Sequence, residues 1–478
     1  MATPVGPSRA EVVVVGSGAA GSAAAIAAAR TGADVLLLEK LPFLGGNSTA
    51  VLDTFYGFYT PGQRAQKVVG GIGDDVVAEL RRLGPVVERA NTYGAGTGIT
   101  YLADHLKVVW EHLVVQSGAR VLLHAFVQDA TAVDGRVTTL TVATKAGLIQ
   151  IAADVVIDAS GDADVCHHAG FGYEAAGAVT PAQTLTTTFR MVNVDHDRRD
   201  QMSKAQFHEA MEQAAESGDY DLPRREGSDH ITPVNGMVAT VMTRIDQLRP
   251  VAATPIHTQQ SPQGTANGPA HPTHTQQFPQ ATANGPAQPV RNATDPEVLT
   301  SAEMEGRRQA LEYVRFLVDR IPGYERASLA ALSTQIGLRE TRRVWGDYRL
   351  TREDVVAARQ FDDQIGLCGA PIEDHHGGAG TGTTWEYLPE GAAVGIPLRT
   401  LVPRDGRNVL VAGRCFSAEH DAQASVRSMA QCMAMGHAAG TVAALAARAD
   451  GEVRSVSPAD ARTWLRKQGA VLSIEESG

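Results

Sequence analysis

The stretch VVVVGSGAAGSAAAIAAARTGADVLLLEK, Val12–Lys40, decides the fold because it places a strand, a glycine turn, a helix and a second strand in order. The β-branched run Val12–Val15 predicts a buried strand. Three glycines follow with G-x-G-x-x-G spacing. Gly16 permits the tight turn, Gly18 lets the backbone approach a pyrophosphate, and Gly21 lets the next helix pack closely on the sheet. The stretch therefore predicts a site for a dinucleotide.

The second half of the stretch narrows the choice of nucleotide. The helix Ala19–Arg30 points its first N–H groups at the phosphates. The strand Asp34–Leu38 ends at Glu39, whose carboxylate can accept hydrogen bonds from ribose hydroxyls and would repel a 2′-phosphate, which favours FAD or NAD over NADP.

The uncharged run Val12–Ala29 is long enough in principle to span a bilayer. It consists mostly of Ala and Gly, with glycines placed for a turn, so we expect no membrane span.

Composition excludes several classes of partner. The chain has 478 residues, and 43% of them are hydrophobic, enough for a sizeable core. The net charge of −11 argues against non-specific binding to nucleic acid or to anionic membranes. Four scattered cysteines do not suit a disulfide framework, and with no targeting segment evident they predict a reducing, cytoplasmic setting. The oligomeric state stays open, a homo-oligomer included.

Periodicity predicts further elements along the chain. Helices are expected at 75–83, 102–117, 203–218, 300–318 and 429–447, and strands at 120–123, 126–132, 154–159 and 409–412. Asp134-Gly135 predicts a hairpin turn. In the region 253–291 the motifs H-T-Q-Q and T-A-N-G-P-A each occur twice. This repeat is rich in Gln, Pro and Asn and nearly free of charge, which predicts a disordered surface loop.

Four motifs carry a family resemblance. They are G-S-G-A-A-G with Glu39-Lys40, G-G-N-S (Gly45–Ser48), D-A-S-G-D-A-D (Asp158–Asp164), and N-V-L-V-A-G-R (Asn408–Arg414) with G-H-A-A-G (Gly436–Gly440) after it. In this order they resemble FAD-dependent oxidoreductases of the glutathione-reductase-like class. Within that class, the chain is most similar to the fumarate reductase and L-aspartate oxidase flavoproteins and to a large FAD-oxidoreductase family beside them. The resemblance covers nearly the whole chain except the repeat.

The resemblance implies FAD as the cofactor and an α/β fold. A Rossmann-like FAD-binding domain is expected from 1–175 and 395–447, with an inserted α+β substrate domain at 176–394 and a C-terminal helix and tail at 448–478. Because four separate segments converge on one long ligand, the arrangement suits a cofactor retained through turnover. The residues expected to bind FAD are Gly16, Ser17, Gly18, Ala20, Gly21, Glu39, Lys40, Gly46, Asn47, Ser48, Val127, Ala159, Ser160, Gly161, Gly413, Arg414 and Ala430.

The segment G-L-R-E-T-R-R, Gly337–Arg343, resembles one seen in the same family. Its arginines Arg339, Arg342 and Arg343 could share one face of a helix or turn. Near the flavin, Arg339 and Arg342 could bind a substrate carboxylate or stabilise anionic reduced flavin. The alternative is structural ion pairing among Arg339, Glu340 and Asp347.

Histidines supply the other catalytic candidates. E-D-H-H-G-G-A-G, Glu373–Gly380, is read as a Gly-rich loop in which His376 could act as general acid or base, or could simply be solvated. His420 follows the last FAD motif and could lie over the flavin, covalently attached or with its pKa tuned by Glu419. Adjacent histidines rarely bind one ion, so we expect no metal site. In Cys166-His167-His168, packing at a helix start is the more common role.

These residues predict an oxidoreductase that transfers a hydride between a small organic substrate and flavin N5. The electron acceptor stays open among oxygen, nicotinamide and a carrier. Two alternatives stay open as well: a flavin-dependent monooxygenase, and a non-redox binding protein on the same fold. Cys415 and Cys432 do not form a C-x-x-C pair, which speaks against disulfide reductase activity. The fuller set of capping-domain arginines and histidines in fumarate reductases cannot be matched here, which speaks against fumarate as the substrate.

Overall fold

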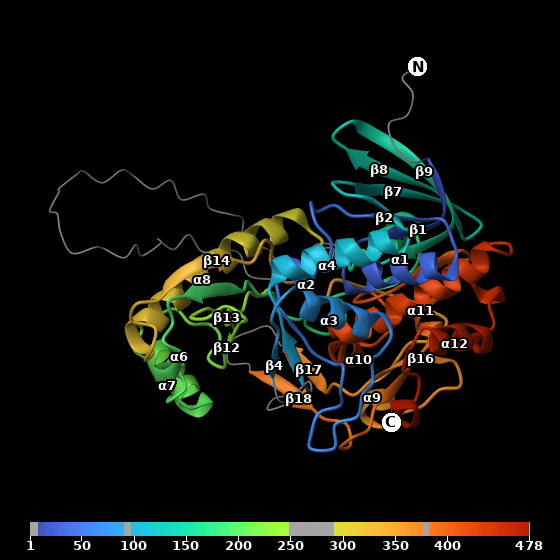
Figure 1. Cartoon of the computed structure of the whole chain (residues 1–478). Coiled ribbons are helices and arrows are strands. Elements are labelled where there is room, and N and C mark those ends of the chain that lie inside the picture. Colours follow the sequence, from blue (N-terminus) through green and yellow to red (C-terminus); the bar gives the residue numbers. More distant parts are fainter. Residues whose placement is uncertain (1–7, 90–96, 248–290, 376–381, 478) are drawn as a thin grey trace.

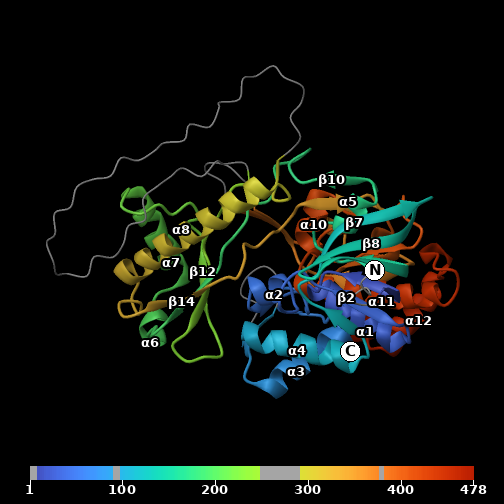
Figure 2. The same ribbon diagram turned by 90° about the horizontal axis from the view of Figure 1, so that it is seen from above.

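The computed structural model describes residues 8–89, 97–247, 291–375 and 382–477. These residues form a larger unit built on a seven-stranded sheet and a smaller unit built on a four-stranded antiparallel sheet (Figure 1). The predicted repeat insert lies outside the described residues up to residue 290, and so does His376. Seen from above, the smaller unit with α7 and α8 lies beside the larger one (Figure 2).

The large sheet joins segments from both ends of the chain. Its parallel strands lie in the order β6, β2, β1, β9, and β20 pairs with the C-terminal end of β9. The antiparallel strands β8 and β7 continue the sheet from the other end of β9. The bounds are β1 Arg9–Val15, β2 Val35–Leu38, β6 Arg120–Leu122, β7 Phe126–Val133, β8 Arg136–Thr144, β9 Gly147–Asp158 and β20 Val409–Val411. The predicted turn is confirmed, because Asp134 and Gly135 join β7 to β8 with positive φ angles of 48° and 75°.

Helices α1 (Ala19–Thr31) and α11 (Met429–Ala447) lie side by side against this sheet (Figure 1). A Cβ atom built on Gly436 would lie 2.0 Å from the carbonyl oxygen of Ala20, and one on Gly440 would lie 2.1 Å from that of Ala24. The two backbones therefore touch directly, which explains why both helices consist of small residues. The run that had the length of a membrane span is a strand, a turn and this closely packed helix. In the described parts of the chain, no helix is long and apolar enough to cross a bilayer.

Short elements complete the larger unit around this core. Its other helices are α2 Asn47–Ala50, α3 Ile72–Leu83, α4 Ala103–Gln116, α5 Asp164–His168, α9 Arg352–Val356, α10 His420–Val426 and α12 Pro458–Lys467, with 3₁₀ turns at Leu398–Leu401, Val453–Ser455 and Ile474–Ser477. Its small sheets are β3 Thr54–Phe55 with β5 Gly98–Thr100 and β4 Val87–Arg89, β10 Tyr173–Ala175 with β15 Arg342–Val344, β16 Gln364–Cys368 with β19 Val394–Pro397, and β17 Ile372–His375 with β18 Thr383–Glu386.

The smaller unit has its own hydrophobic core. Strands β12 (Ser228–Ile231), β13 (Val238–Val241), β11 (Phe189–Val192) and β14 (Ser328–Leu332) lie in this order, with helices α6 (His196–Arg199), α7 (Lys204–Glu216) and α8 (Pro296–Arg320). Buried aromatic side chains from α7, α8 and β11 fill the space between helices and sheet. Ser203 and Gln206 form a capping box at the start of α7, and the Asp295 carboxylate caps α8 ahead of Pro296. The polar helix and the amphipathic helix predicted here are both present.

The later part of the predicted substrate domain, from β15 to β19, packs in the larger unit. Val344, Leu367 and Ile396 are fully buried in the core of the larger unit, whereas the core of the smaller unit draws on residues 189–327. The two-stranded sheets β16–β19 and β17–β18 are too small to bury their own apolar faces. They pack instead on α11 and α10.

Candidate functional site

A long cavity follows the C-terminal ends of the parallel strands in the larger unit. Its empty volume, including the part open to solvent, is about 1500 Å³. The residues that follow β1, β2, β9 and β20 all line it. Ligands of open α/β sheets bind at this edge, where the chain leaves the strands and enters loops and helices.

The glycine turn shapes one wall of the cavity. Gly16 has a φ of +89°, and a Cβ there would lie 2.5 Å from the carbonyl oxygen of Ala159. A Cβ on Gly21 would lie 1.7 Å from the carbonyl oxygen of Gly16, so Gly21 serves helix packing and does not line the cavity. A Cβ on Gly18 would meet nothing within 4 Å. Gly18 therefore leaves open space where a ligand can approach the backbone.

The long helices α1 and α11 both begin at this cavity. The N-cap residues, Gly18 for α1 and Ser428 for α11, make no side-chain capping hydrogen bond, and neither first turn contains an acidic residue. Ala19 and Met429, the first residues of the two helices, line the cavity. Free N–H groups at a helix N-terminus favour a negatively charged ligand. The cavity can therefore hold anionic groups at two points.

Glu39 is fixed at the cavity wall by its neighbours. Its Oε2 atom accepts hydrogen bonds from the backbone N–H of Ser17 (2.8 Å) and from the Ser17 hydroxyl (2.6 Å). Its Oε1 atom accepts a hydrogen bond from the N–H of Leu41 (2.8 Å). The side chain is only 4% exposed and lies at the position expected to meet a ribose.

The motif Asp158–Asp164 forms a loop that its own carboxylates organise. Asp158 is fully buried and accepts hydrogen bonds from the Ser160 hydroxyl (2.7 Å) and the Cys166 N–H (3.0 Å). Burial is the largest cause that raises the pKa of Asp164, and the neighbouring carboxylates of Asp162 and Asp158 raise it further, to about 6. Arg414 pairs with Asp162 (2.6 Å), so this part of the wall is nearly balanced in charge.

Most residues predicted to bind the cofactor line this one cavity. Gly21 and Ala430 do not, because both are buried in helix packing. The predicted residues that line it are Gly16, Ser17, Gly18, Ala20, Glu39, Lys40, Gly46, Asn47, Ser48, Val127, Ala159, Ser160, Gly161, Gly413 and Arg414. The residues fit FAD on structural grounds, since open space at Gly18 and two helix N-termini free of carboxylates face the same cavity.

Two arginines in the cavity wall, Arg339 and Arg427, form no ion pair with a carboxylate of the described residues. Arg339 donates to the carbonyl oxygen of Thr184 (2.6 Å), and Arg427 donates to the side-chain oxygen of Gln183 (2.9 Å). Burial is the largest cause that lowers the pKa of Arg339, and the positive charges of Arg427 and Arg224 lower it further, well below its ordinary value. Arg427 is not among the site residues predicted from the sequence. Its only signal is a single charge between two helices of small, mostly uncharged residues.

Two predictions for the segment Gly337–Arg343 are wrong. Its arginines do not share one face, and Arg339 does not form an ion pair with Glu340 or Asp347. Arg342 and Arg343 lie on the strand β15, where neighbouring side chains point to opposite faces. Arg342 pairs with Asp164 (3.1 Å) and does not line the cavity. Arg343 contacts Glu340 and Glu174. Glu340 therefore does not pair with Arg339, and the other expected partner, Asp347, pairs with Arg454 (2.8 Å).

The segment read as a glycine loop begins as a strand. His375 ends β17, is 4% exposed, and lies 3.0 Å from a Glu373 oxygen through Nε2. Burial, then Arg339, lowers the pKa of His375 to about 3, so the ring is neutral at pH 7. The Glu373 carboxylate can only accept, so Nε2 carries the proton, and Nδ1 accepts from the Thr383 hydroxyl (3.1 Å). The proposed role of His376 lies outside the described residues.

His420 lies between two buried carboxylates rather than in the cavity wall. Its Nδ1 atom lies 3.0 Å from Glu340, and its Nε2 atom lies 3.1 Å from Asp374. Glu419, which precedes α10, accepts instead from the N–H of Arg352 (3.0 Å). With Asp374 and Asp421, His420 forms the one group of potential metal ligands within the described residues.

A family model described as "FAD dependent oxidoreductase" matches residues 11–465. The chain is 47% identical over 58 residues to a "Fumarate reductase (cytochrome)" of Shewanella frigidimarina, which covers 12% of this chain and 10% of that protein. It is 38% identical over 94 residues to a "4-oxocyclohex-2-ene-1-carboxylate 5-dehydrogenase" of Sinomonas cyclohexanicum, covering 20% of this chain and 14% of that one. These matches therefore span only a small part of each relative.

Among solved structures, the chain is similar to a geranylgeranyl bacteriochlorophyll reductase-like protein from Thermoplasma acidophilum. The sequence identity is 13% and the TM-score is 0.42, with 97% of this chain and 83% of that chain covered. It is also similar to BexE, at 15% identity and a TM-score of 0.45, with coverage of 96% and 66%.

Proposed function

The chain belongs to the FAD-dependent oxidoreductase family, and on that premise we propose that it transfers a hydride between a small organic substrate and N5 of bound FAD. Oxidation of a C–H bond and reduction of an activated double bond both fit. The observation that carries the proposal is the single cavity: its wall joins the dinucleotide turn to two arginines that have no carboxylate partner among the described residues.

Different residues along the cavity would hold different parts of the cofactor. The turn at Gly16–Gly18 and the start of α1 would hold the pyrophosphate, Glu39 a ribose, and the backbone near Val127 the adenine. Gly46–Ser48 and the start of α11 would hold the remainder of the cofactor. When bound, the flavin supplies a centre that accepts or donates a hydride.

The substrate would bind where the two units meet. Arg339 lines the cavity and is anchored to Thr184, which precedes β11 of the smaller unit. His375 is held neutral between Glu373 and Thr383, so it orients neighbouring groups rather than supplying a proton. We keep His376 as the candidate acid or base. Arg342 pairs with Asp164, and His420 lies between Glu340 and Asp374, both away from the cavity wall, so neither is part of the proposed reaction.

The test is anaerobic bleaching of the purified, FAD-bound protein against a panel of metabolites. The Arg339→Ala variant should slow bleaching while FAD stays bound. Unchanged reduction kinetics would remove Arg339 from the substrate site, and loss of FAD would reassign it to cofactor binding. A colourless protein that cannot be reconstituted with FAD would refute the redox function. Rapid re-oxidation by oxygen with substrate hydroxylation would indicate a monooxygenase instead.

The electron acceptor and the cellular setting are further parts of the proposal. Oxygen, a nicotinamide nucleotide and a carrier protein are the candidate acceptors, and the rate of re-oxidation by each would distinguish them. All four cysteines are free and buried, which supports a reducing, cytoplasmic setting.

A further inference from the structure

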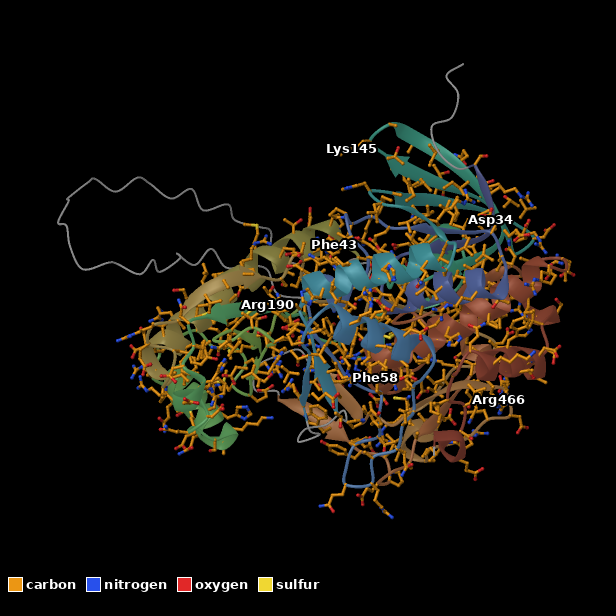
Figure 3. The ribbon with its side chains drawn as sticks, in the orientation of Figure 1. Asp34, Phe43, Phe58, Lys145, Arg190 and Arg466 are labelled. Atoms are coloured by element: carbon orange, nitrogen blue, oxygen red, sulfur yellow. The ribbon has the colours of Figure 1, made fainter. Side chains whose placement is uncertain are left out.

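Four arginines converge between the two units, and we call Arg224, Arg244, Arg339 and Arg427 the arginine cluster. Arg224 precedes β12 and Arg244 follows β13 in the smaller unit, whereas Arg427 separates α10 from α11 in the larger one. The positive charges of Arg427, Arg224 and Arg244 all act on Arg339. Arg190, labelled in Figure 3, lies on β11 of the smaller unit and faces Asp53 instead (3.6 Å).

Two carboxylates face these four guanidinium groups. Arg244 pairs with Glu226 (2.6 Å), and Arg224 lies 3.4 Å from the same oxygen. Although burial opposes ionisation, His375 and the nearby arginines hold the pKa of Glu373 at about 2, so Glu373 is charged. His375 is neutral and contributes no charge. The cluster therefore carries more positive than negative charge, in a chain whose net charge is −11.

Other charged groups near the cluster are already paired. Asp374 and Arg414 both face Arg427. Asp374 pairs with His420 (3.1 Å), and Arg414 pairs with Asp162 (2.6 Å). Asp374 nevertheless acts on Arg427 and offsets part of the positive charge, but four guanidinium groups still face only three carboxylates once Asp374 is counted with Glu226 and Glu373.

The excess charge lies on Arg339 and Arg427. Their acceptors are uncharged: the carbonyl oxygen of Thr184, the side-chain oxygen of Gln183 and, at 3.4 Å, the carbonyl oxygen of Glu373. The Nε atom of Arg427 is buried and has no hydrogen-bond partner in the described part of the chain. Among the described residues, no carboxylate forms an ion pair with either guanidinium group, although Glu373 acts on both and Asp374 acts on Arg427 at longer range.

A buried guanidinium without a counter-ion is costly, because desolvation is not repaid by an ion pair. The cofactor alone does not account for the cluster. The pyrophosphate is expected at the start of α1, and Arg224 and Arg244 do not line the cofactor cavity. The positive charge therefore extends from the end of that cavity into the smaller unit, where a second molecule would lie.

We propose that this second molecule is an organic acid, and that its carboxylate binds Arg339 and Arg427 with Arg224 and Arg244 behind them. The proposal rests on the proposed function, because it names the substrate class of the same site. The planar guanidinium matches a carboxylate with two parallel hydrogen bonds, which a neutral substrate would not provide.

The experiment measures anion binding to the FAD-bound enzyme by isothermal titration calorimetry, with FAD occupancy followed by visible absorbance. The probes are succinate, benzoate, the uncharged succinamide and glycerol 3-phosphate. We expect at least one of the two carboxylates to bind, and succinamide not to bind. The Arg339→Gln and Arg224→Gln variants should each weaken carboxylate binding at least tenfold. Arg224→Gln should do so with full FAD occupancy, since Arg224 is not in the cavity wall.

The matched control is Arg225→Gln, the next residue in the chain. Its side chain is 47% exposed and pairs with Glu212, so carboxylate affinity should not change. Equal carboxylate affinities in the Arg339, Arg224 and Arg225 variants would overturn the proposal. Tighter binding of glycerol 3-phosphate than of either carboxylate would also overturn it.

Binding and flavin bleaching together distinguish failure of the organic-acid site from failure of the proposed hydride transfer. If uncharged substrates alone bleach the flavin, at equal rates in wild type and Arg339→Gln, hydride transfer stands and the organic-acid site is refuted. If carboxylates bind through the cluster while no panel member either bleaches the oxidised flavin or re-oxidises the reduced flavin, the anion site is supported and the proposed reaction is refuted.

Discussion

Glu39→Gln tests how this chain holds a ribose. A carboxylate offers about four acceptor positions. The N–H and hydroxyl of Ser17 and the N–H of Leu41 occupy three of them. One position therefore remains, and we expect Glu39 to accept one ribose hydrogen bond rather than two.

The expected losses of stability and of FAD affinity follow from the number of occupied acceptor positions on Glu39. In the variant one oxygen becomes an NH₂ group, so whichever way the amide turns, the N–H of Ser17 or of Leu41 loses its acceptor. A buried N–H left without an acceptor costs about 1–3 kcal/mol in the free energy of unfolding. The ribose hydrogen bond changes from charge-assisted to neutral, a loss of about 1 kcal/mol. That loss corresponds to a Kd for FAD roughly fivefold higher.

The assay combines the Tm of the FAD-free protein with a titration of FAD. The Tm should fall, and FAD should bind roughly fivefold more weakly. Glu11→Gln is the control, because Glu11 accepts from the N–H of Asp34 (2.7 Å) at an exposed position. An unchanged Tm together with a Kd raised by about two orders of magnitude, equivalent to about 2.8 kcal/mol, would refute the reasoning. It would mean that ribose hydroxyls, not Ser17 and Leu41, hold the carboxylate.

Three other predictions concern packing and charge. Gly440→Ala places a methyl 2.1 Å from the Ala24 carbonyl oxygen, so the free energy of unfolding should fall by up to about 2 kcal/mol, the overpacking cost less the gain in helix propensity; a denaturant midpoint above wild type would contradict this. Burial first, then Asp162 and Asp158, raises the Asp164 pKa to about 6, so its stabilising contribution is present below about pH 4 and lost as pH rises through 6. Asp164→Asn should therefore flatten the dependence of Tm on pH across that window, and parallel curves would exclude the effect. Asp53→Asn removes the buried partner of His230 (3.0 Å) between the two units, so hydrogen exchange in β12 and β13 should speed up, and unchanged exchange would show that the pair does not join them.

Local patterns predicted much of the fold. Small-residue periodicity placed α11 at its observed bounds, and the glycine turn placed β1, α1 and β2, because neighbouring residues determine these structures. Prediction failed where a short strand depends on a distant partner. Arg342 and Arg343 lie in β15 because β10 pairs with it, and His375 ends β17 because β18 pairs with it. Such pairing leaves little signal in a few residues of sequence.

The sequence by itself determined the dinucleotide site, because backbone N–H groups and glycines within one continuous stretch hold a pyrophosphate. The tertiary structure alone decided which charges remain available for a substrate. Arg339, Arg427 and Arg224 come from distant parts of the chain, and whether each meets a carboxylate depends on how the two units pack. His420 shows the same dependence, since Glu340 and Asp374 take both of its ring nitrogens. Charge compensation is a property of neighbours in space, and only folding establishes them.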